Sequence, residues 1–186
     1  MRTTYRKTYW EFEIRDWQPG DRQPAFDLIQ TVLAEYGLIS EPDGADQDVW
    51  HVETAYLERG GEFWVIEQQG KLVGTAAYYP VDRGEQAVEI RKMYLLPQVR
   101  GLGLGRFLLG ILEEAIAQRG YRQIWIETAS VLTEAVYLYE RTGYLPATGV
   151  ETARCDRVYL KQVSPAASSA SVSIADAAAT DVSTTD

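Results

Sequence analysis

The stretch from Arg100 to Gly105, which reads Arg-Gly-Leu-Gly-Leu-Gly, is the part of the sequence that points most directly to chemistry. Glycines allow the backbone to turn tightly and to approach a ligand closely. The stretch follows a predicted strand and opens a predicted helix, and the free N–H groups at a helix N-terminus favour a bound anion. It therefore predicts a phosphate- or pyrophosphate-binding turn, with a plain flexible connection as the alternative.

Two well-known phosphate-binding motifs do not fit this turn. A Walker loop ends in Gly-Lys-Ser/Thr, whereas Gly105 is followed by Arg106 and Phe107. The dinucleotide-binding pattern requires a third glycine, but the two positions where it could fall are occupied by Arg106 and Leu108. The turn therefore matches neither of these two phosphate-binding motifs.

Together with its flanks, the segment Glu89–Ile116 resembles the central acetyl-CoA-binding motif of the GNAT superfamily of N-acetyltransferases. That motif has the form Arg/Gln-x-x-Gly-x-Gly/Ala, which is matched here by Arg100, Gly103 and Gly105. A second block, Ala135–Tyr144, reads AVYLYERTGY and resembles the late helix of the family, usually Ala-x-x-Leu-Tyr-Glu-Lys-x-Gly-Phe. Two blocks in the right order are far more specific than either block alone.

The resemblance covers roughly residues 10–163 and implies an α/β (α+β) fold. We expect a central mixed, mostly antiparallel sheet of about seven strands flanked by about four helices. Residues 1–10 are predicted to be an N-terminal extension, and residues 11–163 a single N-acetyltransferase-like domain. Residues 164–186 are rich in Ala, Ser and Thr and contain no aromatic residue, so they are predicted to form a disordered tail.

Local patterns predict the elements that position these motifs. Alternation of polar and apolar residues indicates strands, and apolar residues three and four positions apart indicate helices. Strands are expected at Glu11–Trp17, Phe63–Gln68, Leu72–Val81, Ala87–Leu96, Gln123–Thr128, Tyr144–Ala147 and Arg157–Val163. Helices are expected between Asp21 and Gly37, at Asp48–Glu58, from Leu104 to Gly120 and at Thr133–Arg141.

The resemblance also implies which residues bind the cosubstrate acetyl-CoA. Strand residues would offer backbone groups to the pantetheine arm, and backbone N–H groups of the glycine-rich turn would bind the pyrophosphate. The strand residues are Met93, Tyr94 and Leu95, and the turn residues are Arg100, Gly101, Leu102, Gly103, Leu104, Gly105 and Arg106. An asparagine that the family often has near the start of the late helix is replaced here by Val131-Leu132-Thr133.

Acetyl transfer to an amine requires removal of a proton from the amine and benefits from protonation of the leaving thiolate. The resemblance implies direct attack without an acyl-enzyme. This agrees with the sequence, whose single histidine, His51, is not expected to activate Cys155 as a nucleophile. Glu89 is the first candidate for the catalytic base, with a structural ion pair to Arg91 as the alternative. Glu127 is a second candidate for the base.

Tyr139 matches the tyrosine of the late helix block, which in the family acts as general acid toward the cofactor sulfur. The alternative is a buried core tyrosine at helical spacing. Tyr137 is offset by two helical positions and is expected to face elsewhere.

The amino-acid composition excludes several classes of binding partner. The 186 residues carry a formal net charge of −9, so the basic surface of a duplex nucleic-acid binder or of a protein attracted to anionic lipid is missing. One cysteine and one histidine exclude an intramolecular disulfide and make a metal site unexpected. No apolar run approaches the roughly 18 residues of a membrane span. We expect a cytoplasmic protein without metal, nucleic-acid or membrane partners, and the sequence leaves a homodimer open.

The resulting hypothesis is an enzyme, an acyltransferase that moves the acetyl group of acetyl-CoA to the primary amine of a small or amino-acid-like molecule. Four acidic residues, Glu41, Asp43, Asp46 and Asp48, either form a rim that attracts a cationic amine or are simply solvated. Two alternatives remain on the same fold: a non-catalytic acyl-CoA-binding or sensor module, and a protein acetyltransferase that acts on Lys or N-terminal amines.

Overall fold

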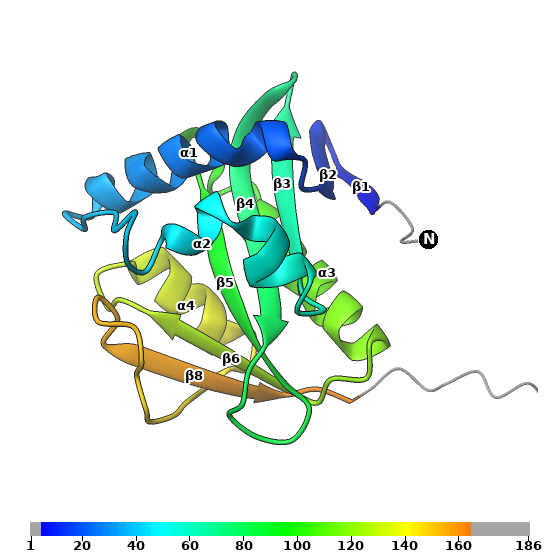
Figure 1. Ribbon diagram of the computed structural model, residues 1–186, viewed down its shortest axis with the longest axis vertical. Helices are drawn as coiled ribbons and strands as arrows, with labels where there is room; N and C mark the ends of the chain where they lie inside the picture. The colour runs from blue at the N-terminus through cyan, green and yellow to red at the C-terminus, as the bar shows by residue number, and fades with distance from the viewer. Residues whose placement is uncertain (1–4, 165–186) are drawn as a thin grey trace, which may run out of the picture.

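A computed structural model describes residues 5–164, which form a single twisted sheet with helices on both faces (Figure 1). Apart from its first residue, the predicted disordered tail lies outside the described residues. The sheet contains eight strands in the order β1-β2-β3-β4-β5-β6-β8-β7. They are β1 (Arg6–Tyr9), β2 (Phe12–Asp16), β3 (Glu62–Gln68), β4 (Lys71–Pro80), β5 (Ala87–Leu95), β6 (Gln123–Thr128), β7 (Leu145–Pro146) and β8 (Arg157–Gln162).

The helices divide the apolar side chains of the sheet between two cores. One core lies between the sheet and the helices α3 and α4, and the other lies between the sheet and α1, α2 and η2. The helical elements are α1 (Arg22–Glu35), α2 (Gln47–Trp50), α3 (Leu104–Gln118), α4 (Thr133–Arg141), the π-helical turn η2 (Glu53–Leu57), and the short 3₁₀ turns η1 (Pro19–Asp21) and η3 (Pro97–Val99). This is the predicted mixed, mostly antiparallel α/β architecture.

Two expectations from the sequence differ from the structure. Residues 6–9, predicted to belong to an extension, form β1 and pair antiparallel with β2 from Arg6↔Arg15 to Tyr9↔Phe12. This strand lies at a sheet edge with alternating exposed and half-buried residues, so it lacks the apolar signal of a core strand. The single helix predicted at Asp48–Glu58 is split into α2 and η2, because His51 leaves the helical conformation with φ −131° and ψ 40°.

The only parallel pair of strands within the described residues is β5 with β6, and it is short. Its register runs from Ala87↔Gln123 to Ile90↔Ile126, whereas β5 continues to Leu95. Beyond Ile90 the two strands therefore separate. All other neighbouring strands pair antiparallel, as expected for a meander and its hairpins.

A β-bulge in β5 changes which side chains face each core. The register between β4 and β5 shifts between Thr75↔Tyr94 and Ala77↔Arg91, and Lys92 in the bulge has φ +51°. The Oγ1 of Thr75 donates a hydrogen bond to the carbonyl oxygen of Lys92 at 2.6 Å and so fixes the bulge. Bulges commonly redirect side chains beside functional sites, and here Arg91 and Lys92 both reach Asp48 on α2.

Candidate active site

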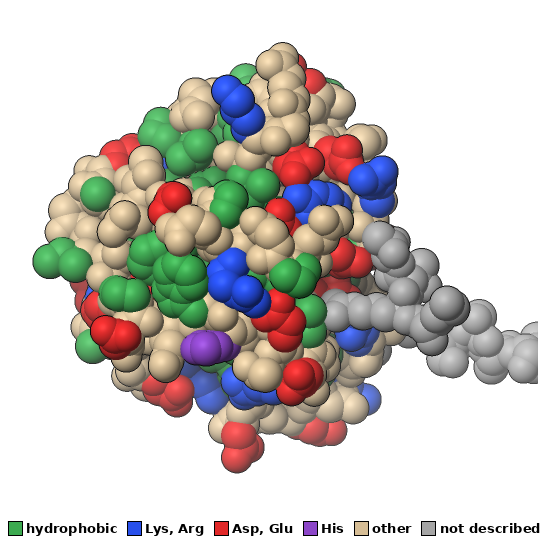
Figure 2. All heavy atoms as spheres, turned by 45° about the horizontal axis from the view of Figure 1, so that its top comes forward, with side chains coloured by type: hydrophobic (Ala, Val, Ile, Leu, Met, Phe, Trp, Pro, Cys, Tyr) green, Lys and Arg blue, Asp and Glu red, His purple; other side chains and the backbone are tan. Residues whose placement is uncertain are grey.

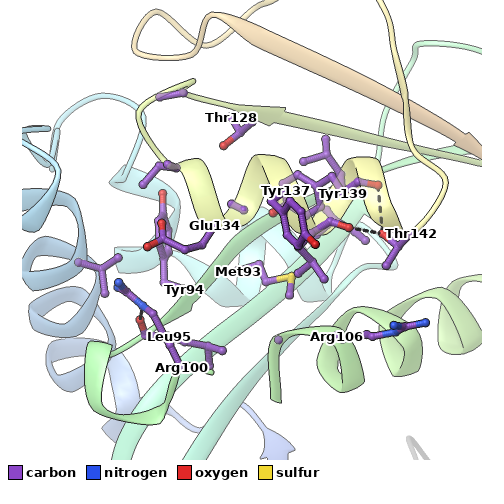
Figure 3. Close-up of a pocket in the computed structure, with 18 of the residues that line it drawn as sticks. Met93, Tyr94, Leu95, Arg100, Arg106, Thr128, Glu134, Tyr137, Tyr139 and Thr142 are labelled. Atoms are coloured by element: carbon purple, nitrogen blue, oxygen red, sulfur yellow. Dashed lines mark hydrogen bonds between the residues drawn. The ribbon is translucent and has the colours of Figure 1, made fainter. Parts of the chain in front are cut away.

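A cleft of about 500 Å³ opens where β5 and β6 separate. We call it the main cleft; its walls are formed by β5 from Ile90 to Leu95, β6 from Ile126 to Thr128, the turn before α3, and α4 (Figure 3). Backbone groups of β5 that face this gap have no partner strand among the described residues. Because backbone N–H and C=O groups need hydrogen-bond partners, this edge can bind an extended polar ligand.

The glycine-rich turn closes one end of the main cleft with free donors. Gly101 and Gly103 have φ +75° and +79°, a conformation that favours glycine. Within the described residues, no backbone or side-chain acceptor is found for the N–H groups of residues 101–106, and the first such donor is Phe107, bonded to the carbonyl of Gly103 at 3.0 Å. A run of free N–H groups at the start of α3 fits a pyrophosphate.

Most residues predicted to bind the cofactor line the main cleft. They are Met93, Tyr94, Leu95, Arg100, Gly101, Gly103, Gly105 and Arg106. The side chains of the remaining two, Leu102 and Leu104, do not: Leu104 is buried in the core beneath α3, and Leu102 is 39% exposed. These two residues can contribute only their backbone N–H groups.

Arg100 connects the glycine-rich turn to α1. Its guanidinium donates hydrogen bonds to Glu35 at 2.8 and 2.9 Å and to the Tyr36 hydroxyl at 2.9 Å, and its Nε donates to the carbonyl of Leu95 at 2.9 Å. The Tyr36 hydroxyl in turn donates to Glu134 of α4 at 2.8 Å. The predicted cofactor residue Arg100 therefore positions the turn and lines the main cleft, with its charge already paired.

Tyr139 of α4 lines the main cleft, as does Met93 of β5 (Figure 3). Tyr139 is 5% exposed, and its ring contacts Tyr144 and Tyr159 at centroid distances of 5.8 and 6.2 Å. Burial raises the pKa of its hydroxyl well above the usual range, with a smaller contribution from Tyr94. The hydroxyl therefore stays protonated at neutral pH and can donate a proton. Tyr137, expected to face elsewhere, is 62% exposed and lines the outer part of the same cleft.

Glu89 does not line the main cleft but a neighbouring small chamber of about 40 Å³, which we call the side chamber. The side chamber is lined by Glu89, Arg91, Lys92, Tyr94, Glu127, Thr152, Arg154 and Cys155. Five of these residues line both cavities: Arg91, Lys92, Tyr94, Glu127 and Cys155. The two cavities are therefore neighbours on a shared wall, with Glu89 on one side and Tyr139 on the other.

The two candidate bases differ sharply in their surroundings. Glu89 is 5% exposed, and burial raises its pKa from 4.5 to about 7, although Arg91, with its Nε 3.8 Å from Oε1, opposes that rise. Glu127 accepts hydrogen bonds from Arg83 at 2.8 Å and from the backbone N–H groups of Glu151 and Thr152 at 2.9 and 2.8 Å. Burial acts to raise the pKa of Glu127, but these donors outweigh it and lower the pKa. Glu89 is the better proton acceptor near neutral pH.

A buried ionic cluster that the sequence did not predict supports the side chamber. Asp46, fully buried, accepts hydrogen bonds from Lys92 at 2.6 Å and from two nitrogens of Arg154 at 2.5 and 2.7 Å. Burial would raise the pKa of Asp46, but the two cations hold it well below its usual range. The acidic loop is therefore neither solvated nor an open rim at Asp46, and the sequence pattern carries no local signal for this cluster.

His51 and Cys155, the single histidine and the single cysteine of the chain, have no assigned role in the reaction. His51 is exposed on the surface (purple in Figure 2). Burial raises the pKa of the Cys155 thiol to about 11, which keeps it protonated. Over residues 5–164 no group of three His, Cys, Asp or Glu side chains is arranged for a metal ion, and no helix is long and apolar enough to cross a membrane. The cytoplasmic location and the absence of metal and nucleic-acid partners stay predictions.

Known proteins resemble this chain both in sequence and in fold. The model of the acetyltransferase (GNAT) family matches residues 8–144. An uncharacterized N-acetyltransferase, YjgM of Escherichia coli K12, is 34% identical over 120 residues, which cover 63% of this chain and 72% of the relative. The chain spans about half the length of further curated relatives that it matches.

Two solved structures illustrate the shared fold. An acetyltransferase of the GNAT family from Staphylococcus aureus Mu50 has a TM-score of 0.76 at 19% identity, covering 81% of this chain and 98% of that chain. Spermidine N-acetyltransferase from Vibrio cholerae, in complex with CoA and spermine, has a TM-score of 0.62 at 16% identity, covering 83% and 96%. At these identities the likeness concerns the fold alone. The family match over most of the chain settles its membership: this protein belongs to the GNAT family of acetyltransferases.

Proposed function

We propose that this protein is an acetyl-CoA-dependent N-acetyltransferase whose acceptor is the primary amine of a small molecule. The observation that carries the proposal is the main cleft, which is lined both by the unpaired edge of β5 and by the turn that carries the free N–H groups of residues 101–106. Family membership supports it, as does the shared fold with a spermidine N-acetyltransferase that was solved with CoA and spermine.

The main cleft offers separate places for the parts of acetyl-CoA. The N–H groups of residues 101–106 would bind the pyrophosphate, and backbone groups of Met93 and Leu95 would pair with the amides of the pantetheine arm. When bound, acetyl-CoA supplies the acetyl group as a thioester that an amine can attack directly.

In the proposed reaction Glu89 would act as the general base and Tyr139 as the general acid. The acceptor nitrogen forms a bond to the acetyl carbon while the bond from that carbon to sulfur breaks. The amine proton passes to the Glu89 carboxylate, directly or through water, and the Tyr139 hydroxyl donates a proton to the leaving thiolate. The pKa of about 7 for Glu89 suits a base near neutral pH. Burial raises the pKa of Tyr139, so its hydroxyl carries its proton at neutral pH.

A panel of amine acceptors, assayed with acetyl-CoA by release of free thiol, tests the proposal. Tyr139→Phe should lower kcat by about 10²–10⁴, and Glu89→Gln by a similar factor, because each removes a general acid or base. Calorimetric affinity for CoA should stay near that of the wild type in both variants. Turnover of both folded variants within about twofold of the wild type would remove the assigned roles.

The same assay separates the competing functions. Binding of acetyl-CoA without turnover of any acceptor would favour a non-catalytic acyl-CoA-binding or sensor module. Turnover confined to peptides or proteins would favour a protein acetyltransferase. For the proposed enzyme, kcat/KM should rise about tenfold per pH unit below pH 7 and level off above it, as Glu89 loses its proton. Glu89→Gln should lack this inflection.

A further inference from the structure

The side chamber contains an arginine whose hydrogen-bonding capacity is largely unused. Arg91 is buried to 19% side-chain exposure, yet its guanidinium makes one hydrogen bond within the described residues, from Nη1 to the Tyr79 hydroxyl at 2.8 Å. Its Nε lies 4.0 Å from Asp48 and 3.8 Å from Glu89, too far for a hydrogen bond. Arginine presents five N–H donors in a fixed fork that matches a carboxylate.

The other two cations that line the side chamber are already occupied. Lys92 donates to Asp46 at 2.6 Å and to the carbonyl of Ala45 at 2.7 Å, and it lies 3.1 Å from Asp48. Arg154 forms a two-point contact with Asp46. Among the cations of the side chamber, Arg91 therefore has the most donors left for a ligand, because it makes one hydrogen bond and no two-point contact with a carboxylate.

Four cations and five carboxylates lie around the side chamber. Arg83, Arg91, Lys92 and Arg154 supply the positive charges, and Asp46, Asp48, Glu89, Glu127 and Glu151 supply the negative charges. Within the described residues, Arg91 is the one of these cations that forms no hydrogen bond to a carboxylate. Burial of a charge without a hydrogen-bonded partner is unfavourable, so an anionic group would be stabilised at this position.

We infer that the side chamber binds an α-amino-acid head group, with the carboxylate of the acceptor on Arg91 and its amine toward Glu89. This inference rests on the proposed acetyltransferase function and names the acceptor class for it. The neighbouring Arg91 and Glu89 side chains, 3.8 Å apart, complement a carboxylate and an amine carried by one carbon atom. The volume of about 40 Å³ fits a compact polar head group.

Matched acceptors test the inference. Each standard amino acid is assayed beside its α-amide and its decarboxylated amine, with acetyl-CoA and thiol detection. At least one amino acid should exceed both partners in kcat/KM by about 10- to 100-fold, the worth of hydrogen bonds to a charged group. In Arg91→Met this preference should fall to within about threefold, and Arg91→Lys, which keeps the charge but loses the fork, should be intermediate.

Arg59 provides the matched control. Its guanidinium lies over the same Tyr79 ring at 4.4 Å, but it is exposed and does not line the side chamber. Arg59→Met should therefore keep the preference for the amino acid. Melting curves for all variants establish that they are folded, and Arg91→Lys carries the test if Arg91→Met does not fold.

Calorimetry with the N-acetylated amino acid and CoA gives a second measurement that needs no turnover. The wild type should bind the acid at least about tenfold more tightly than its amide, Arg91→Met should lose that difference, and Arg91→Lys should reduce it. A kcat/KM for amides or polyamines equal to that for the amino acids, or a preference for amino acids that persists in the Arg91 variants, would overturn the inference. The proposed acetyltransferase function would still stand. Carboxylate-dependent binding without turnover of any amine would instead support this site and reject the proposed function.

Discussion

The hydroxyl of Tyr9 donates a hydrogen bond to the backbone carbonyl of Leu102 at 3.1 Å, across 93 residues of chain. The Tyr9 ring also stacks on Phe107 of α3 with a centroid distance of 4.4 Å. The edge strand β1 thus contacts both the glycine-rich turn, at Leu102, and the first turn of α3, at Phe107. A segment that looks like an extension in the sequence holds the turn whose N–H groups face the main cleft.

This contact predicts that Tyr9→Phe weakens CoA binding about two- to tenfold, since a single hydrogen bond contributes roughly 0.5–1.5 kcal/mol. The ring stacking is retained, so the melting temperature should change little. Calorimetric titration with CoA measures the effect. Lys7→Met is the control. Lys7 lies on the same strand as Tyr9, but it pairs with Glu114 of α3 at 3.2 Å, away from the turn. Equal affinities of Tyr9→Phe and the wild type would refute the role of Tyr9.

Gly103→Ala is expected to weaken CoA binding by about tenfold or more. An added Cβ would lie 2.8 Å from the Tyr9 hydroxyl, and the backbone has φ +79°, a region that costs other residues roughly 1–2 kcal/mol. The turn must therefore shift, and its N–H groups shift with it. Gly110→Ala in the middle of α3 is the control: its Cβ meets nothing within 4 Å. That variant should keep CoA affinity and gain up to about 1 kcal/mol of stability.

Glu89→Gln should change how folding stability depends on pH. Burial raises the pKa of Glu89 from 4.5 to about 7 in the folded protein, so between these values the folded state binds more protons than the unfolded state. Stability of the wild type therefore falls as pH rises through this window, by up to about 3 kcal/mol. The glutamine variant lacks this loss. Its stability relative to the wild type should increase from pH 4.5 to pH 7.5 in urea titrations, and parallel curves would contradict the shift.

Asp46→Asn should destabilise the fold by about 3–5 kcal/mol, because it leaves Lys92 and Arg154 buried without their shared counter-charge. Chemical denaturation at pH 7 measures the loss. Asp43→Asn in the same loop is the control, since Asp43 is exposed and its substitution should cost less than about 0.5 kcal/mol. A small effect at Asp46 would mean that the two cations find other partners.

The sequence by itself determined the features that depend on neighbouring residues. Alternation and helical spacing predicted most strands and helices within a few residues, because one buried face imposes a local period. The glycine-rich turn could be read for the same reason: its chemistry lies in consecutive backbone N–H groups at the start of one helix. The match to a known family motif then supplied the candidate roles of Glu89 and Tyr139.

Tertiary structure decided what depends on distant residues. The edge strand β1 has no apolar face to signal it, and its function appears only when Tyr9 meets Leu102. The contact between Asp46 and Arg154 spans 108 residues, and no local pattern encodes such a pair. A bulge at Lys92 brings Lys92 to the same side of the sheet as Arg91, where both reach Asp48. Where a charged side chain points depends on backbone register and on partners from other elements, so the side chamber, where we propose that the acceptor binds, could be found only in the folded chain.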